Sequence, residues 1–261
     1  MIPAMCLPSL NVDGKVAFVT GTGSGLGRAI SIGLAQAGAD LALTELPDRL
    51  DAARETAREI EKLGKRAHVV PLDVMKLSQI GESVDAVLKH FGHLDILVNN
   101  AGVNIPKLAV DVTEADWDKV MAIDLKGVFF TTQTVAKKAL IPQGAGKVVN
   151  IASQMGVVGY KYRAAYCSAK AGVVNLSRVL AFEWAKHKIT VNSVAPTFID
   201  TPLTRPMFED KEFYNDVISR IPMGRLGTPE DVVGAVVYLS SPAADMVTGH
   251  TLLVDGGWTA V

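Results

Sequence analysis

Residues 15–27, KVAFVTGTGSGLG, are the part of the sequence that is most informative about the fold. It begins as an apolar run typical of a buried strand, passes through a glycine-rich turn and leads into the apolar pattern of a helix over residues 26–37. Glycines at such a turn let the backbone bend sharply and let the amide groups of a helix N-terminus approach a pyrophosphate. The spacing of Gly21, Gly25 and Gly27 departs from the GxGxxG fingerprint. Taken alone, the turn is therefore equally compatible with a plain tight turn.

Further apolar runs resemble the first strand, and longer amphipathic segments separate most of them. Helical patterns lie between the predicted strands, for example over residues 48–63 and 77–91. Strands that are apolar on both faces and separated by helices predict a parallel sheet covered on both sides. The further runs cover residues 41–44, 66–70, 94–98, 146–152, 189–195 and 251–255. No linker, repeat or composition shift divides the chain, so the sequence predicts one α/β domain over residues 1–261, with a doubly wound parallel sheet of seven strands.

Composition and charge argue against several classes of protein. The chain has 261 residues, is 49% hydrophobic and carries a formal net charge of -1, which offers no general attraction to nucleic acid or to an anionic membrane. The N-terminal MIPAMCLPSL lacks the basic and apolar regions of a signal peptide, and no segment is apolar over a membrane-spanning length. Two cysteines, Cys6 and Cys167, cannot form a disulfide framework. We therefore expect a cytoplasmic protein with no nucleic-acid or membrane partner.

Glu45 stands at the end of the second predicted strand. A carboxylate there can accept hydrogen bonds from the hydroxyls of an adenosine ribose, although an ordinary solvated glutamate would look the same in the sequence. Glu45 should repel a 2′-phosphate, and Ser24 supplies no cation to bind one. These two positions favour NAD(H) over NADP(H).

Tyr166 and Lys170 lie four residues apart in AYCSAKAG, residues 165–172, so they face the same way one turn apart on the predicted helix. Lowering the pKa of a phenol from about 10 to about 7 needs roughly 4 kcal/mol. An ammonium group about 4 Å away supplies that much at an effective dielectric constant of 20, although desolvation of the phenolate opposes it. Such a pair can arise by chance, so its significance depends on the rest of the chain.

Several motifs in a fixed order carry a resemblance to a known family. They are TGTGSGLG (20–27), LDV (72–74), NNAG (99–102), Ser153, YCSAK (166–170), NSVAPTFIDT (192–201) and VDGG (254–257). Each falls at a predicted strand end or helix, and together they make the chain similar to the short-chain dehydrogenase/reductase family from about Asp13 to the C-terminus. The resemblance implies a Rossmann-type fold and a reversible hydride transfer between NAD(H) and a secondary alcohol or ketone.

The resemblance also implies catalytic roles. Tyr166, as a phenolate, would remove the hydroxyl proton, Ser153 would hydrogen-bond the substrate oxygen, and Lys170 would bind the nicotinamide ribose and pass the proton toward water. Two positions depart from the family pattern. Asp124 replaces the Asn that supports a water in the proton relay, and Thr197 replaces the Gly that follows a proline after the sixth strand.

The same resemblance assigns the cofactor-binding residues. Asp73 would lie near the adenine, Asn99 and its neighbours would line the cofactor cleft, and Thr201 would contact the nicotinamide carboxamide. The expected set is Gly21, Ser24, Gly25, Leu26, Gly27, Glu45, Asp73, Val74, Asn100, Ala101, Gly102, Tyr166, Lys170, Pro196, Ile199 and Thr201.

The substrate is the least determined feature. Four polar residues suit a hydroxyl-rich or carboxylated molecule, namely Asn104, Gln154, Lys161 and Arg163. An apolar set would suit a lipid-like alcohol, namely Met155, Val157, Phe198, Leu203 and Met207. Similarity of SQMG and APTFIDTPLT to dehydrogenases of sugars and sugar acids favours a polyol, sugar or sugar acid. The alternatives are a 3-oxoacyl-(acyl carrier protein) reductase-like enzyme, a steroid or lipid alcohol dehydrogenase, and a non-catalytic dinucleotide sensor.

Three expectations concern other parts of the chain. The segment at about 198–225 would form a lid over the substrate, by resemblance. The predicted helix over 164–185 is apolar around most of its circumference, which indicates a subunit interface, and the resemblance suggests a homotetramer. His90 and His93 have no third ligand nearby in sequence, so no metal site is expected.

Overall fold

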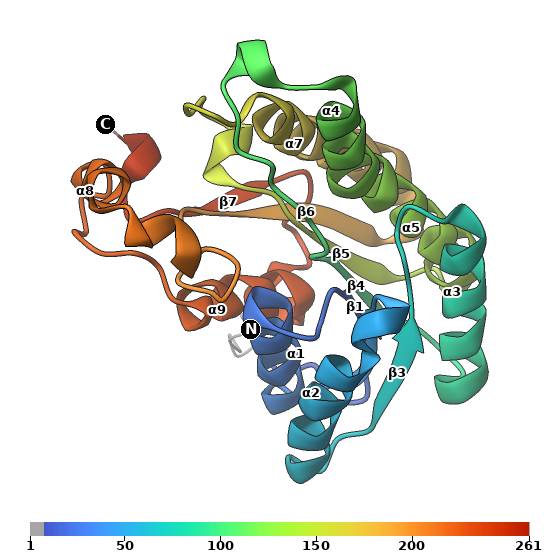
Figure 1. The fold of residues 1–261 in the computed structure, drawn as a ribbon. Coiled ribbons are helices and arrows are strands. Elements are labelled where there is room, and N and C mark those ends of the chain that lie inside the picture. Colours follow the sequence, from blue (N-terminus) through green and yellow to red (C-terminus); the bar gives the residue numbers. More distant parts are fainter. Residues whose placement is uncertain (1–7, 261) are drawn as a thin grey trace.

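The computed structural model describes residues 8–260, so the expectation for Cys6 lies outside the described residues. These residues form a seven-stranded parallel sheet in the order β3-β2-β1-β4-β5-β6-β7, between two layers of helices (Figure 1). The strands are β1 (Val16–Thr20), β2 (Asp40–Glu45), β3 (Ala67–Pro71), β4 (Ile96–Asn99), β5 (Gly146–Ile151), β6 (Ile189–Pro196) and β7 (Thr251–Val254). The predicted strands are confirmed, with ends that differ by at most two residues.

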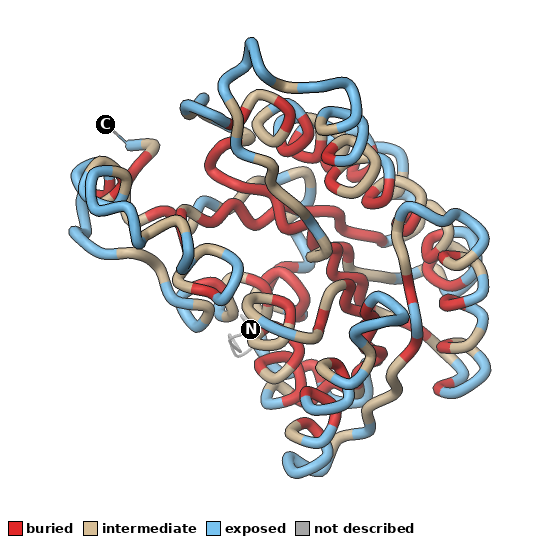
Figure 2. The backbone as a smooth tube through the Cα atoms, viewed as in Figure 1, coloured by how far each residue is buried: buried red, intermediate tan, exposed pale blue. Residues whose placement is uncertain are grey.

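The helices divide between the two faces of the sheet. On one face α1, α2 and α9 pack against Ala17 and Val19 of β1, and on the other face α3, α5 and α7 pack against Val16 and Phe18. Because every residue of β1 is buried, the strand is apolar on both faces, as Figure 2 shows for the whole centre of the sheet. The helices are α1 (Gly25–Gln36), α2 (Leu50–Lys62), α3 (Leu77–Phe91), α4 (Glu114–Met121), α5 (Val128–Val135), α6 (Ile141–Gln143), α7 (Ala164–Trp184), α8 (Lys211–Ser219) and α9 (Pro229–Ser240).

The helical stretch from α4 to α6 is continuous but irregular. It starts at a capping box in which Thr113 and Asp116 satisfy each other's backbone amides. Two π-helical turns, η3 (Ala122–Gly127) and η4 (Ala136–Leu140), then interrupt the α-helical geometry. A π-helical turn is rare and often lies at a functional site. Here η3 contains Asp124, whose side chain is completely buried and lies at the carboxyl ends of the strands, on the wall of the cavity described below.

A chain of buried polar side chains joins the central strands to α7. The Asn99 amide donates to Asn150 Oδ1 at 2.8 Å, the Asn150 amide donates to Ser177 Oγ at 2.9 Å, and Ser177 lies 2.8 Å from Ser193 Oγ. Asn99 lies on β4, Asn150 on β5, Ser177 on α7 and Ser193 on β6. Because satisfied buried hydrogen bonds of this kind fix a unique packing, they hold the strand ends in register beneath the cavity described below.

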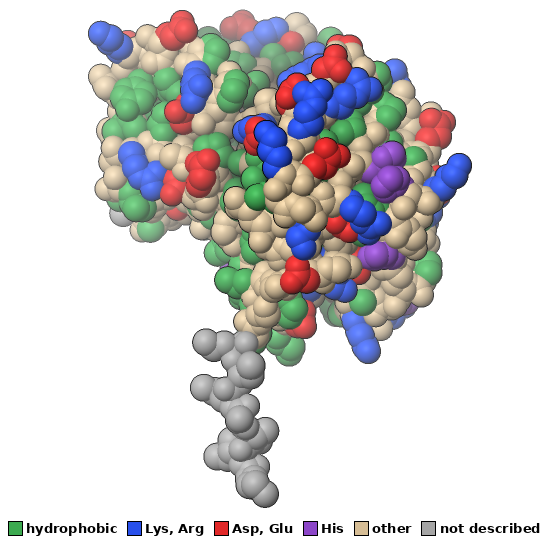
Figure 3. Space-filling view, turned by 90° about the horizontal axis from the view of Figure 1, so that it is seen from below, with side chains coloured by type: hydrophobic (Ala, Val, Ile, Leu, Met, Phe, Trp, Pro, Cys, Tyr) green, Lys and Arg blue, Asp and Glu red, His purple; other side chains and the backbone are tan. Residues whose placement is uncertain are grey.

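Charged side chains of both signs are mixed on the face seen from below in Figure 3. Figure 3 shows Lys, Arg, Asp and Glu interspersed over one face, in keeping with the net charge of -1. His90 stacks on His68 with ring centres 4.1 Å apart, and His93 lies 3.3 Å from Asp95. Between residues 8 and 260 no three His, Cys, Asp or Glu side chains are grouped as metal ligands. Over the same range, no helix is both long and apolar enough to cross a bilayer.

Candidate active site

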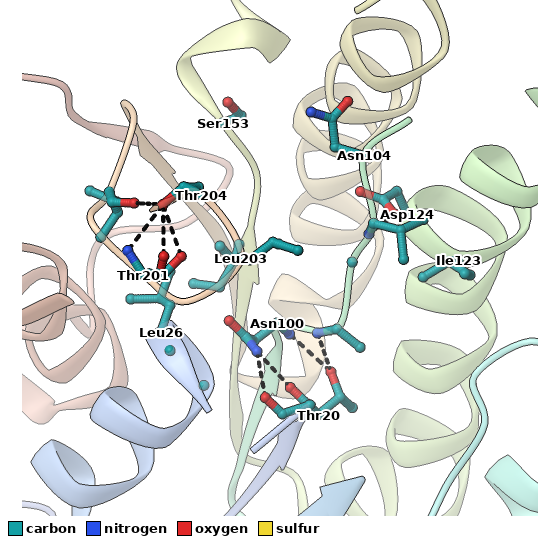
Figure 4. A pocket seen from close by; sticks show the side chains of 18 of the residues that line it. Thr20, Leu26, Asn100, Asn104, Ile123, Asp124, Ser153, Thr201, Leu203 and Thr204 are labelled. Atoms are coloured by element: carbon teal, nitrogen blue, oxygen red, sulfur yellow. Dashed lines mark hydrogen bonds between the residues drawn. The ribbon is translucent and has the colours of Figure 1, made fainter. Parts of the chain in front are cut away.

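A cavity of about 740 Å³ opens at the carboxyl ends of the strands. It lies between β1 and β4. From β1 the following strands are added toward one edge of the sheet, and from β4 they are added toward the other edge. Such a reversal of strand order is the usual place for a ligand in an open parallel sheet. The structure brings to its wall every residue of the expected cofactor set, together with Ser153 and Asp124. Figure 4 shows part of this wall.

One end of the cavity is built by the glycine-rich turn after β1. Gly21 has a φ of +71°, and a Cβ at Gly27 would lie 2.0 Å from the carbonyl oxygen of Gly21, so neither position accepts a larger residue without movement. Thr20 Oγ1 accepts the backbone N–H groups of Asn100 and Ala101, both at 2.9 Å, and the Asn100 amide donates to the Thr20 and Gly21 carbonyls (Figure 4). The ends of β1 and β4 are thereby tied together. The bridging role of Thr20 was not predicted from the sequence.

Glu45 lies against the same turn. Its Oε2 accepts the Gly23 N–H at 2.8 Å and its Oε1 accepts the Leu46 N–H at 3.0 Å. The carboxylate is 7% exposed, so it is fixed on the cavity wall and is not an ordinary solvated group. Arg49, which follows Glu45 by four residues, is exposed and also lines this end of the cavity. Sequence reasoning missed Arg49 because the chain turns back toward the cavity after β2.

The other end of the cavity holds Tyr166 and Lys170. Lys170 is buried; its Nζ donates to the Ile151 carbonyl at 2.9 Å and lies 5.5 Å from the centre of the Tyr166 ring. The same Nζ lies 3.3 Å from Asp124 Oδ2. A Cβ at Gly102 would approach Asp124 Oδ2 to 3.1 Å, so the loop after β4 packs directly on this ion pair.

Asp124 changes the electrostatics of the pair. Its Oδ1 accepts the Val103 N–H at 2.8 Å, and burial raises the pKa of its carboxyl although Lys170 opposes the rise. The pKa of Tyr166 is also raised, chiefly by burial and further by the Asp124 carboxylate, while Lys170 and Ser153 act in the opposite direction. In the protein alone, the expected opposition of desolvation is therefore larger than the effect of Lys170 on the pKa of Tyr166, and the Asp124 carboxylate adds to that opposition.

Unpartnered polar atoms mark the part of the cavity nearest Ser153. Ser153 Oγ accepts the Met155 N–H at 3.1 Å. Asn104 Oδ1 and Thr197 Oγ1 are buried without a hydrogen-bond partner among the described residues. Ser153 and Asn104 lie at the same end of the cavity, away from Thr20 and Asn100 (Figure 4). This end can therefore receive a molecule with hydrogen-bonding groups.

The predicted substrate-binding residues divide into two groups. The structure places Asn104 and Arg163 on the cavity wall, and with them the apolar Met155, Phe198, Leu203 and Met207. It does not bring the remaining three to the wall. Lys161 lies 3.3 Å from Asp216 in an ion pair, Val157 is half exposed away from the cavity, and Gln154 is completely buried. Within the described chain, the side-chain amide of Gln154 has no hydrogen-bond partner.

The segment after β6 covers the cavity from one side. Its 3-10 turn η7 (Arg205–Glu209) contributes Phe208, and helix α8 contributes Phe213 and Val217, to an apolar cluster that also contains Tyr160 and Trp258. Tyr160 also donates from its hydroxyl to Asp216 of α8 at 2.6 Å. The segment is thus attached by an aromatic cluster, and Leu203 and Met207 reach the cavity from it.

Comparisons with known proteins agree with this geometry. Residues 21–259 match the family model described as enoyl-(acyl carrier protein) reductase. A 2-dehydro-3-deoxy-D-gluconate 5-dehydrogenase from Escherichia coli (strain K12) is 40% identical over 98% of this chain and 100% of its own. An NAD-dependent glycerol dehydrogenase from Listeria innocua is 36% identical over 95% of each chain. A gluconate 5-dehydrogenase from Burkholderia cenocepacia J2315, solved in complex with NADP and tartrate, has a TM-score of 0.93 and 34% identity over 98% of this chain and 99% of its own.

Proposed function

Because the chain belongs to the short-chain dehydrogenase/reductase family, we propose that it transfers hydride reversibly between NAD(H) and a secondary alcohol or ketone of a sugar acid, sugar or polyol. The observation that carries the proposal is the convergence of Ser153, Tyr166 and Lys170 on the cavity that also contains the glycine-rich turn. The relatives named above are oxidoreductases of sugar acids and glycerol.

The cavity fits a nicotinamide dinucleotide. The absence of a Cβ at Gly27 lets the first turn of α1 pack on the Gly21 carbonyl beside the cavity, and a helix N-terminus of this kind binds phosphates; the Glu45 carboxylate lies on the same wall and would accept hydrogen bonds from ribose hydroxyls. When bound, such a cofactor supplies the hydride acceptor or donor and, in its oxidised form, a positive charge. Asp73 would lie at the adenine and Thr201 at the nicotinamide.

The protein's own groups handle the proton. Tyr166, as a phenolate, accepts the proton of the substrate hydroxyl, and Ser153 hydrogen-bonds the same oxygen and holds it in place. Lys170, anchored to the Ile151 carbonyl, stabilises the phenolate and takes part in passing the proton outward. Asp124 holds Lys170 by its carboxylate, where the family pattern has an amide, and so limits the stabilisation that Lys170 gives.

We propose NAD(H) as the preferred cofactor. The Glu45 carboxylate is buried against the turn, and a 2′-phosphate in its place would meet a negative charge in a region of low dielectric constant. Arg49 is the neighbouring cation that could bind such a phosphate if Glu45 were removed.

We also propose that residues 198–225 act as a lid over the substrate.

We further propose that the protein is a homotetramer. On α7 Phe182 is 88% exposed and Val179 is 46% exposed, although both belong to its apolar surface. A shallow groove that includes Leu176 of α7 is lined mainly by apolar residues, namely Met121, Ala122, Leu125, Phe129, Phe130 and Leu176, with Asp118 and Lys126 also on its wall. Exposed apolar surface of this kind is typical of a subunit interface.

A substrate screen tests the proposed function. Polyols, sugars, sugar acids and hydroxy acids are offered with NAD and with NADP, and nicotinamide absorbance is followed, with steroid, hydroxyacyl thioester and simple aliphatic alcohols as comparison. We expect the highest kcat/KM for a polyhydroxylated compound with NAD. A far higher kcat/KM for a lipid-like alcohol would overturn the substrate class, and no turnover of any alcohol by the purified enzyme would overturn the activity.

A further inference from the structure

Arg163 is a buried cation at the substrate end of the cavity. It immediately precedes α7, three residues before Tyr166, and lies on the cavity wall with only 3% of its surface exposed. Its Nη1 donates to the Tyr162 carbonyl at 3.3 Å, and its Nη2 lies 3.5 Å from the sulfur of Met207. No carboxylate of residues 8–260 forms an ion pair with it.

These two contacts leave most of the guanidinium unsatisfied. A guanidinium has five N–H donors, and a thioether sulfur is only a weak acceptor. Burial lowers the pKa of Arg163, because the charged form loses its hydration. A buried charge without a counterion is strongly unfavourable. An anionic group in the adjoining cavity would remove that penalty.

The other charged side chains on the wall are not available for an anion at this end. Lys170 is paired with Asp124. Glu45, Arg49 and Asp73 line the cavity near the turn after β1 and the ends of β2 and β3. Arg163 contacts Met207, and its charge interacts with the phenols of Tyr160 and Tyr166. The same wall includes the apolar Met155 and Phe198, which cluster with Tyr166, and such surroundings keep the local dielectric constant low and strengthen any ion pair formed there.

The backbone holds Arg163 in place. Tyr162 has a φ of +63°, which is uncommon for a residue other than glycine and has an energetic cost. The Tyr162 carbonyl accepts both the Lys107 N–H at 3.2 Å and the Arg163 Nη1. The turn is thus fixed to the loop that follows β4, the loop that also carries Asn104. A side chain positioned in this way loses little freedom on binding.

We propose that Arg163 binds a carboxylate of the substrate, so that the substrate is a sugar acid or another hydroxy acid and not a neutral polyol. This inference rests on the proposed function above. A guanidinium can bind a carboxylate through two parallel hydrogen bonds, which fixes orientation as well as position. Because Arg163 lies one helical turn from Tyr166, the carboxylate and the reacting hydroxyl belong to the same small molecule. Asn104 Oδ1 is placed to accept a hydrogen bond from a further hydroxyl.

The test compares gluconate with glucitol, which has the same carbon chain but a hydroxymethyl group in place of the carboxylate. The variants are Arg163→Met and Arg163→Lys, with Arg54→Met as the matched control, because Arg54 is an exposed arginine of α2 outside the cavity wall and is paired with Asp51 at 2.6 Å. We expect wild type to prefer gluconate by at least about 10-fold in kcat/KM. Arg163→Met should lower kcat/KM for gluconate by about 10- to 100-fold, as for loss of hydrogen bonds to a charged group, mostly through KM, and change glucitol little. Arg163→Lys, which keeps the buried charge and the fold, should give an intermediate loss.

Two results would overturn the inference while leaving the proposed function intact. Equal losses on gluconate and glucitol would mean that Arg163 acts only on the Tyr166 phenolate. A wild-type enzyme that prefers glucitol would contradict it without any variant.

A binding measurement covers the case in which neither compound is turned over. Tartrate, a hydroxy acid, is titrated calorimetrically into the enzyme with NADH present. Binding that is lost in Arg163→Met and kept in Arg54→Met supports the inference. Equal binding by both variants, or no binding by wild type, overturns it.

Discussion

Replacing Asp124 by asparagine should move the pH dependence of the reaction toward lower pH. Asp124 Oδ2 lies 3.3 Å from Lys170 Nζ, which lies 5.5 Å from the centre of the Tyr166 ring. The carboxylate is therefore within about 9 Å of the ring centre, where a unit charge is worth about 1.8 kcal/mol at an effective dielectric constant of 20. This corresponds to more than one pKa unit. Asp124→Asn keeps the shape of the side chain but removes the charge that raises the pKa of Tyr166.

The sign of the shift follows from the role of the phenolate. Oxidation of an alcohol needs Tyr166 without its proton, so the acid limb of kcat/KM reports the pKa of the group that must be ionised. With the carboxylate gone this pKa falls, and the acid limb should move down by at least about one pH unit. The assay is the pH profile of alcohol oxidation, with Asp111→Asn as control because Asp111 is exposed. An acid limb that stays in place would show that the Asp124 carboxylate carries no charge in the working enzyme.

Four further predictions concern other parts of the molecule. Tyr166→Phe should lower turnover by at least about 10²-fold, while NADH binding followed by fluorescence stays near the wild-type value; retention of most activity would assign the base elsewhere. Glu45→Ala should weaken the preference for NAD(H), measured as the ratio of kcat/KM for the two cofactors, and Arg49→Ala in that background should reverse part of the gain with NADP(H); a wild-type preference for NADP(H) contradicts the assignment. Gly27→Ala should abolish cofactor binding in calorimetry, because the added Cβ meets the Gly21 carbonyl at 2.0 Å, and unchanged binding would show that the turn can relax. Phe182→Asp should shift the sedimentation coefficient from that of a tetramer toward smaller species, and a wild-type monomer at micromolar concentration would refute the interface.

Much of the fold follows from the sequence because its apolar runs are unambiguous. Each strand of the parallel sheet is buried on both faces, so it appears as a short continuous apolar segment between turn-forming residues. Residues 77–91 were predicted as a helix and form α3 with the same ends. The sequence TEAD at residues 113–116 has the form of a capping box, and it forms one at the start of α4.

The remaining features depend on contacts that a linear pattern does not contain. The π-helical turn η3 leaves the apolar periodicity of its neighbours intact, so the residue pattern does not indicate that Asp124 reaches Lys170. Lys161 was expected among the polar residues that suit a hydroxyl-rich substrate, but Asp216 of α8, distant in sequence, pairs with it instead. Asn99 was expected to line the cofactor cleft, yet it faces Asn150 and Thr132 inside the sheet, and Asn100 reaches the cavity.

The strand order has a consequence for how the chain folds during synthesis. In the sheet Ala17 of β1 pairs with Ile96 of β4, which leaves the ribosome much later. At about 5–20 residues per second, roughly 4–16 s pass between the synthesis of the two residues. Throughout that interval β1, with all its residues apolar or buried in the finished fold, presents one unpaired edge. Slow closure of a non-local parallel pair exposes a chain to aggregation, so the yield of folded protein should depend on translation rate and on chaperones that cover this edge.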